Sequence, residues 1–199
     1  MTESENAYKC VYKQAEEAGC RVVASQYASK KGFTGWADFK EREPLTQEKL
    51  DWLNLNRANA DLMVGLPSKV IALDFDSEDE ELNKKIEHLL PTSKCEKVGA
   101  KGWTRFFKYT DTFKDSIQVK CKGKVVFEIL SNTKKTTVPP SRHPSGMNYK
   151  WTGKSLWELK DELEPLPPIF LSNIRAILAI EEREYTICLL YTSPSPRDS

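Results

Sequence analysis

Two aspartates at the end of a short apolar run are the residues of this sequence best suited to chemistry. The run begins at Val70 and ends with Asp74, Phe75 and Asp76. Because successive side chains of a strand point to opposite faces, both carboxylates would share one face. Desolvating two like charges there is costly, and a divalent cation such as Mg²⁺ or Mn²⁺ offsets that cost. The alternative is a strand followed by an acidic helix cap, since residues 77–81 continue the acidic run.

Positive charge is concentrated in the middle third of the chain. The net charge is only +1, but residues 94–154 carry 14 Lys and Arg against 4 Asp and Glu. Such asymmetry indicates a polyanionic partner. Three lysines around Gly123 are candidates to follow a nucleic-acid backbone, and a solvated hairpin is the equally simple alternative; they are Lys120, Lys122 and Lys124.

Composition bounds the class of protein. The 199 residues, of which 39% are hydrophobic, suffice for one domain with a real core. No apolar run is long enough to span a bilayer, and the polar, acidic start lacks the features of a signal or transit peptide. Five scattered cysteines without a Cys-x-x-Cys pair favour reduced thiols over a zinc site or a disulfide framework. We therefore expect a cytoplasmic protein without a membrane partner.

The hydrophobic pattern predicts an α+β fold, in which helices flank a mostly antiparallel sheet. The predicted helices cover residues 7–19, 46–56, 78–90, 154–163 and 170–183. The predicted strands cover residues 21–24, 58–65, 70–76, 103–109, 125–130 and 136–138, with a hairpin turn at Gly123.

Two further motifs follow the aspartates. Residues 98–109 form a glycine-containing turn that leads into a strand with basic residues. Glu128 lies between two apolar residues of the next strand and therefore faces away from them. The sequence Thr137-Val-Pro-Pro-Ser-Arg-His-Pro and then Tyr149-Lys-Trp151 come after it.

Together these motifs, over roughly residues 7–151, resemble the N-terminal catalytic domain of the bifunctional DNA primase–polymerases in the archaeo-eukaryotic primase superfamily. The resemblance implies a primase-type catalytic core with an RRM-like element. It assigns Asp74 and Asp76 to the first motif and Glu128 to the third, where they would bind two Mg²⁺ or Mn²⁺ ions for nucleotidyl transfer on single-stranded DNA.

The resemblance also implies residues that contact the nucleoside triphosphate. These are Lys101, Arg105, Ser141, Arg142 and His143. Many relatives carry a histidine in the second motif, where this chain has Trp103-Thr-Arg105. Arg105 or Lys101 would then hold phosphate instead. His143 would either approach the nucleotide or order its own turn.

We expect three parts of the chain, and the first of them follows from this resemblance. Residues 1–164 would be the catalytic domain. Residues 165–187, which begin with three prolines among four residues, would be a linker and the start of a truncated C-terminal region, and the helix over 170–183 would belong to that region. Residues 188–199 resemble the translation of a transposon-type sequencing adapter, so we expect them to be read-through rather than native sequence.

The expected partners are single-stranded DNA, nucleoside triphosphates and a helicase region C-terminal to this fragment, in a phage- or plasmid-type replication protein of a bacterial or infected-host cytoplasm. Two other functions remain open. One is a non-catalytic module that binds single-stranded nucleic acid. The other is a metal-dependent phosphatase with Asp74 as nucleophile, although such enzymes usually need a doubly wound parallel sheet.

Overall fold

The computed structural model describes residues 6–32 and 57–192. The predicted helix over 46–56 lies outside these residues. The α-helices are α1 (Ala7–Glu17), α3 (Glu80–Ile86), α4 (Leu156–Leu159) and α5 (Ile169–Thr192), and the 3₁₀ helices are η2 (Glu87–Leu89), η3 (Asp111–Phe113) and η4 (Lys160–Glu162). None of the helices in the described ranges combines the length and apolar character needed to cross a membrane.

The strands form two sheets, in which every pairing between named strands is antiparallel. The larger has the order β6 (Ile117–Cys121), β7 (Lys124–Leu130), β3 (Val70–Phe75), β5 (Trp103–Lys108), β4 (Glu96–Val98), β9 (Lys150–Trp151). The smaller has the order β1 (Val22–Gln26), β2 (Ala58–Met63), β8 (Lys135–Val138). With helices packed outside the sheets, the predicted α+β class is confirmed.

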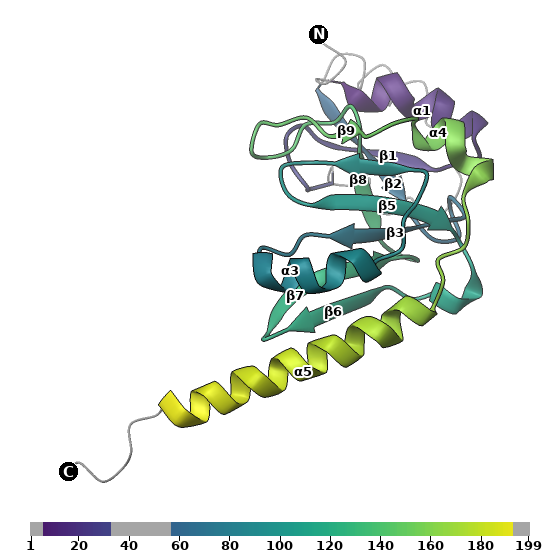
Figure 1. Cartoon of the computed structure of the whole chain (residues 1–199). Coiled ribbons are helices and arrows are strands. Elements are labelled where there is room, and N and C mark those ends of the chain that lie inside the picture. The colour runs from purple at the N-terminus through teal and green to yellow at the C-terminus, as the bar shows by residue number, and fades with distance from the viewer. Residues whose placement is uncertain (1–5, 33–56, 193–199) are drawn as a thin grey trace.

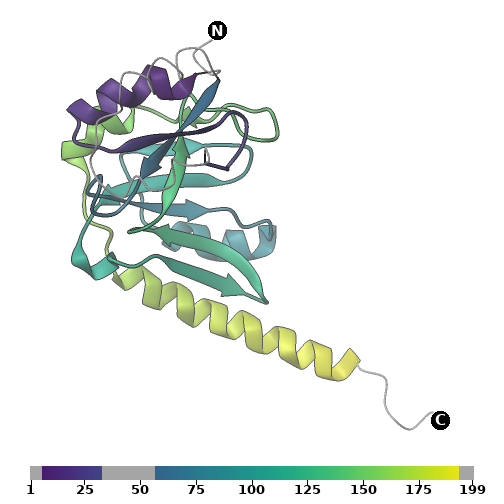
Figure 2. The same ribbon diagram turned by 180° about the vertical axis from the view of Figure 1, so that it is seen from behind.

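Strand β3 lies inside the larger sheet and separates two hydrophobic cores. Val70 and Ala72 belong to the core formed with α1, α4 and the smaller sheet. Ile71, Leu73 and Phe75 point to the other face and belong to the core formed with α3 and α5. Figures 1 and 2 show this layering, with α1 and α4 at one end of the molecule and α3 and α5 at the other.

Local signals set the ends of the predicted elements. Helix α1 starts where the Asn6 side chain accepts a hydrogen bond from the backbone N–H of Lys9 (3.2 Å). Helix α3 starts after Asp79, which accepts from the N–H of Leu82 (3.0 Å). Lys122 and Gly123 both have positive φ (51° and 77°), which is the geometry of a two-residue hairpin between β6 and β7. The predicted hairpin is confirmed.

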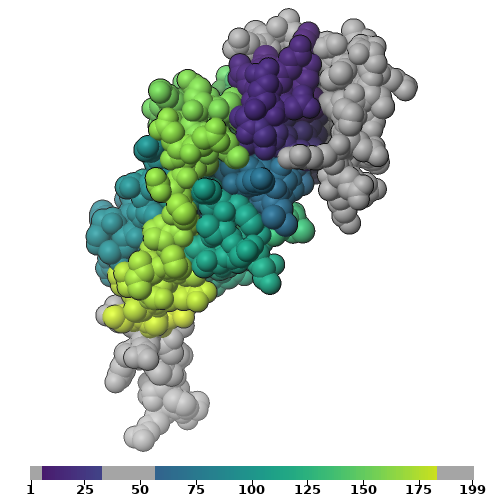
Figure 3. Space-filling view, turned by 90° about the vertical axis from the view of Figure 1, so that its right-hand side faces the viewer, coloured from purple at the N-terminus to yellow at the C-terminus, as the bar shows by residue number. Residues whose placement is uncertain are grey.

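Helix α5 packs on the larger sheet instead of standing apart from it. Its buried side chains join the core beneath β6 and β7; they are Phe170, Leu171, Ile174 and Leu178. The Glu181 carboxylate accepts from Lys85 of α3 and lies 3.5 Å from Lys122 of the hairpin. In Figure 3 this yellow-green helix lies against the teal part of the surface. The division at residues 164 and 165 stays a prediction, but the first half of α5 shares the core of the preceding residues.

Candidate active site

A row of polar side chains crosses one face of the larger sheet. Asp74 of β3 is the direct cross-strand partner of Glu128 on β7 and of Thr104 on β5. Beyond them, Glu128 faces Gln118 of β6, and Thr104 faces Lys97 of β4. Because cross-strand partners share a face, these five side chains form a continuous row, which we call the polar row, on the side of the smaller sheet.

Asp74 and Glu128 form the acidic centre of the polar row. The Thr104 hydroxyl donates to Asp74 Oδ1, and Gln118 Nε2 donates to Glu128 Oε1 at 2.6 Å. Each of these bonds engages one oxygen of its carboxylate. Both acidic side chains are half-buried, whereas Asp76, one residue beyond the strand, is exposed. The structure therefore brings Asp74 and Glu128 together and leaves Asp76 at the edge of the row.

The oxygen atoms of this acidic centre are of the kind that a hard divalent cation prefers as ligands. Carboxylate oxygens are the ligands that Mg²⁺ and Mn²⁺ prefer, and cross-strand partners have Cβ atoms about 5 Å apart. Among the side chains of residues 6–32 and 57–182, however, no three from Asp, Glu, His or Cys are grouped as a metal site. Asp74 and Glu128 thus fit such an ion in type and placement, and the exposed Asp76 side chain would have to turn toward them.

Lys97 closes the polar row on the β4 side. It is 4% exposed, its Nζ donates to the carbonyl oxygen of Thr137 (2.6 Å), and it lies 4.7 Å from the centre of the Tyr149 ring. Burial lowers the pKa of Lys97 from 10.5 to about 8, although the negative charges of Asp74 and Asp61 oppose that effect. The polar row therefore holds a desolvated ammonium close to its acidic centre.

Tyr149 forms the outer wall beside Lys97. A Cβ added to Gly99 would lie 2.8 Å from the Tyr149 ring, so only glycine allows the ring to pack there. Burial and the negative charges of Asp74, Asp61 and Asp76 raise the pKa of Tyr149 to about 12. The neutral phenol is thus strongly favoured at physiological pH.

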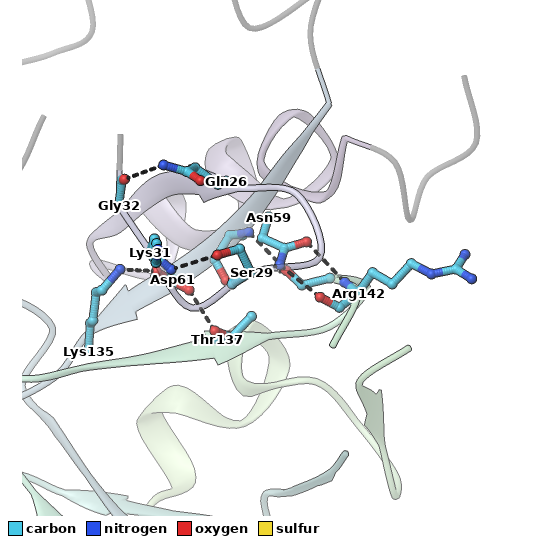
Figure 4. A network of polar contacts seen from close by, with 11 residues as sticks. Gln26, Ser29, Lys31, Gly32, Asn59, Asp61, Lys135, Thr137 and Arg142 are labelled. Carbon is cyan, nitrogen blue, oxygen red and sulfur yellow. Dashed lines mark hydrogen bonds and ion pairs between the residues drawn. The ribbon is translucent and has the colours of Figure 1, made fainter. Parts of the chain in front are cut away.

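A buried carboxylate on the smaller sheet anchors strand β8 beside Lys97. Asp61 is 1% exposed, accepts from the ammonium of Lys135, and accepts from the Thr137 hydroxyl at 2.7 Å (Figure 4). Thr137 is the residue whose carbonyl receives the Lys97 ammonium. Asp61 therefore fixes the strand that positions Lys97.

The loop after β8 is tied to β2 by side chains and backbone together. Ser141 is fully buried, and its hydroxyl accepts from the N–H of Ala60 (2.8 Å). Asn59 accepts from the N–H of Arg142 (3.0 Å) and donates to its carbonyl (2.8 Å). The Arg142 guanidinium points away from this network (Figure 4). Ser141 thus holds the loop in place, and Arg142 projects its charge outward.

His143 and Lys101 both lie close enough to Asp76, at the edge of the polar row, to feel its charge. His143 Nδ1 lies 2.8 Å from the Ser145 hydroxyl, and its ring meets that of Tyr149 edge-on at 5.7 Å. Burial and then the charge of Lys30 lower the pKa of His143, while Asp76 opposes them. Lys101 is exposed and forms an ion pair with Glu78, which raises the pKa of Lys101. His143 therefore orders its own turn and still borders the site.

Residues 13–169 match the family of bifunctional DNA primase/polymerase N-terminal domains. The chain belongs to this family. The match covers the polar row, the loop that contains His143 and the start of α5. It supports a DNA primase or polymerase type of function, with DNA and nucleotides as substrates. A comparison with curated proteins gave no match.

Arg105 lies on the opposite face of this primase/polymerase domain from Asp74. Its cross-strand partner on β3 is Leu73, so its side chain points away from the polar row. The guanidinium donates to Glu96 (2.8 Å) and to the carbonyl of Pro91 (3.1 Å), and it stacks 3.7 Å from the centre of the Trp103 ring. These contacts bind Arg105 to the outer side of the sheet.

The hairpin lysines of the primase/polymerase domain differ in their surroundings. Lys120 and Lys124 are exposed on strands β6 and β7. Lys122 instead faces α5, where it lies 3.5 Å from Glu181. The hairpin thus offers two outward lysines and one that helps to dock the helix.

The sequence did not mark three residues that the fold brings to the site, namely Lys97, Gln118 and Asp61. Tyr149 belongs to a motif that carries the family resemblance, but that motif assigns it no role in the site. Thr104 was noted only as a residue standing where relatives carry histidine, yet it is the direct partner of Asp74. The two-residue period of a strand is the local signal for its face, because it places Thr104 opposite Trp103 and Arg105. No comparable signal marks Lys97, because β4 is only three residues long.

Proposed function

We propose that this domain makes or extends primers on a single-stranded DNA template by nucleotidyl transfer. The observation that carries the proposal is the cross-strand pairing of Asp74 and Glu128 within the segment that matches the primase/polymerase family. The antiparallel pairing between all named strands of the described residues also weighs against the phosphatase alternative, which usually needs a parallel sheet.

Asp74, Asp76 and Glu128 would hold two Mg²⁺ or Mn²⁺ ions. When bound, such ions make the primer 3′-hydroxyl more acidic and neutralise charge on the departing pyrophosphate. Thr104 and Gln118 would keep the carboxylates of Asp74 and Glu128 aimed along the row through their hydrogen bonds. This positioning matters because small displacements of catalytic groups greatly reduce rates.

Three residues at the rim of the site would bind the incoming triphosphate, Lys101 and Arg142 through their charge and His143 through its ring. Ser141 would act indirectly, since its buried hydroxyl holds the loop that carries two of them. We do not include Arg105, because its guanidinium is engaged by Glu96 on the other face. Lys120 and Lys124 are the hairpin residues best placed to follow the template, since both are exposed.

The wider setting is proposed by analogy with the family. Such domains precede a helicase in replication proteins of phages and plasmids, so the partner would be a helicase region and the compartment the cytoplasm of a bacterium or an infected host. Co-purification of the full-length gene product with helicase activity would test this.

Primer extension and de novo primer synthesis on single-stranded DNA, each with Mg²⁺ or Mn²⁺, test the proposed chemistry. Wild type should form products, and Asp74→Asn and Glu128→Gln should each reduce the rate by at least 100-fold while remaining folded. Asp161→Asn, which changes an exposed carboxylate of η4, is the matched control and should behave as wild type.

A binding module without catalysis is the second candidate, since Thr104 stands where many relatives carry histidine. Template binding that survives EDTA, with no product from wild type in either metal, would favour that function and reject nucleotidyl transfer. Release of phosphate from a small monoester, without nucleotide incorporation, would instead favour the phosphatase function.

A further inference from the structure

Lys97 is unlike the other lysines that the structure describes. Among the described lysines it alone is buried, at 4% exposure, and its side chain lies in the polar row. Its strand position places it next to Thr104 and two strands from Asp74 in the polar row. Burying an ammonium is costly unless something compensates for the lost hydration.

The described residues compensate for only part of that loss. An ammonium has three N–H donors, and Lys97 uses one of them on the Thr137 carbonyl while the Tyr149 ring covers one side. No described carboxylate forms an ion pair with it. Asp61 already accepts from Lys135 and Thr137, and Asp74 accepts from Thr104. The surrounding fold therefore holds the Lys97 side chain in place but leaves part of the hydrogen-bonding capacity of its ammonium unused.

The missing partner should be an anion with several oxygen acceptors. The charges of Lys30, Lys101 and Lys97 all act on His143, so Lys30 and Lys101 add positive charge on the same side as Lys97. A phosphate chain can accept from several ammonium groups at once and is attracted by their summed charge. A carboxylate of the protein itself does not fill this role, because none in the part of the chain that the structure describes forms an ion pair with Lys97.

We propose that Lys97 binds phosphate oxygens of the incoming nucleoside triphosphate, held in place by the Thr137 carbonyl and the Tyr149 ring. This proposal rests on the proposed function, because it assigns one contact in the same site. It makes Lys97 a substrate-binding residue of the polar row rather than a structural cation. Asp61 and Gly99 become positioning residues, since one fixes β8 and the other admits the Tyr149 ring.

Nucleotide binding measured apart from turnover tests the role of Lys97. The affinities of wild type and Lys97→Met for dATP and for inorganic pyrophosphate are compared by calorimetry in Ca²⁺, and the KM for dATP is compared in primer extension. Loss of a charge-assisted hydrogen bond predicts affinities that are about 10- to 100-fold weaker for both ligands, with unchanged affinity for primer–template. Lys97→Arg should recover part of the loss, because it restores the charge.

Lys150→Met is the matched control. Lys150 is exposed on the neighbouring strand β9 and faces Val98, so its side chain lies on the other side of the sheet from Lys97. Its substitution should leave dATP affinity unchanged. If Lys97→Met does not fold, Lys97→Gln replaces it, since an amide can still donate to the Thr137 carbonyl but carries no charge.

The outcomes separate this proposal from the proposed function. A folded Lys97 variant that binds dATP and pyrophosphate as wild type does would overturn the role of Lys97, even if primer extension by wild type succeeds. Weaker binding of both ligands by the variant would support it, even if wild type forms no product. An equal loss of template and nucleotide binding would assign Lys97 to the structure and overturn the proposal.

Discussion

Replacing Lys97 by methionine should stabilise the folded protein at neutral pH while it weakens nucleotide binding. The two side chains are similar in length and volume, so the substitution removes the charge without opening a large cavity. Lys97 is 4% exposed, and its nearest acidic neighbours are bonded to other groups. The buried charge is therefore a net cost to stability.

The pKa of Lys97 gives the size of that cost. Burial lowers the pKa from 10.5 to about 8, against the opposing attraction of Asp74 and Asp61, and this difference corresponds to roughly 3 kcal/mol. Methionine loses the bond to the Thr137 carbonyl and the contact with the Tyr149 ring, which together are worth about 1–2 kcal/mol. The expected net stabilisation is about 1–2 kcal/mol, or a Tm increase of roughly 2–8 °C.

The pH dependence has a definite sign. Below pH 8 the lysine is charged in both the folded and the unfolded state, so the full cost is present. Between about pH 8 and 10.5 the folded state releases its proton first, and the stability of wild type rises with pH by about 1.4 kcal/mol per pH unit from this group. Methionine does not titrate, so its advantage should shrink across that window.

Urea unfolding of wild type, Lys97→Met and the control Lys150→Met at pH 7, 8, 9 and 9.5 measures both effects. The difference between the first two isolates Lys97, because the other titrating groups are common to both. Destabilisation by more than 1 kcal/mol at pH 7 would refute the reasoning and show that Lys97 is a net stabilising cation. A difference that stays constant across the series would refute the lowered pKa.

Three further substitutions test other parts of the structure. Ile174→Ala, at a fully buried position of α5, should cost about 2–4 kcal/mol in a single cooperative urea transition, and an unchanged midpoint would show that α5 folds separately. Ser141→Ala should cost about 1–3 kcal/mol by chemical denaturation, because it leaves the N–H of Ala60 without its acceptor; equal stability would contradict the role of the hydroxyl in the loop. Thr104→Val keeps the shape of the side chain but removes the donor to Asp74, so primer extension should slow about 10-fold with unchanged dATP affinity. Loss of dATP affinity instead would place Thr104 at the nucleotide.

Helix α5 shows where local patterns stop being informative. Its apolar spacing predicted a helix correctly, but spacing alone does not say what the apolar face contacts. The prolines before it suggested a linker, whereas Leu166 is buried and the N–H of Lys108 donates to the carbonyl of Glu164 (2.9 Å). Burial of Ile174 beneath the hairpin depends on where the sheet stands, and that is a property of the whole fold.

The sequence by itself determined the elements and the faces of their side chains. Strand alternation placed Asp74 and Asp76 away from Phe75, and it placed Glu128 away from the apolar residues beside it. Capping residues set the ends of helices, and the glycine turn set the hairpin. These signals can be read from the sequence because each acts on atoms only a few residues away. The motifs that carry the family resemblance are likewise local.

Only the tertiary structure decided which strands became neighbours and in what register. That register placed Glu128 and Thr104 on either side of Asp74, turned Arg105 to the other face, and brought Lys97 into the row. Side-chain orientation within a strand repeats every two residues and can be predicted locally, but pairing joins segments far apart in sequence through backbone hydrogen bonds and shared burial. The carboxylates could therefore be predicted from the sequence, whereas the buried lysine beside them could not.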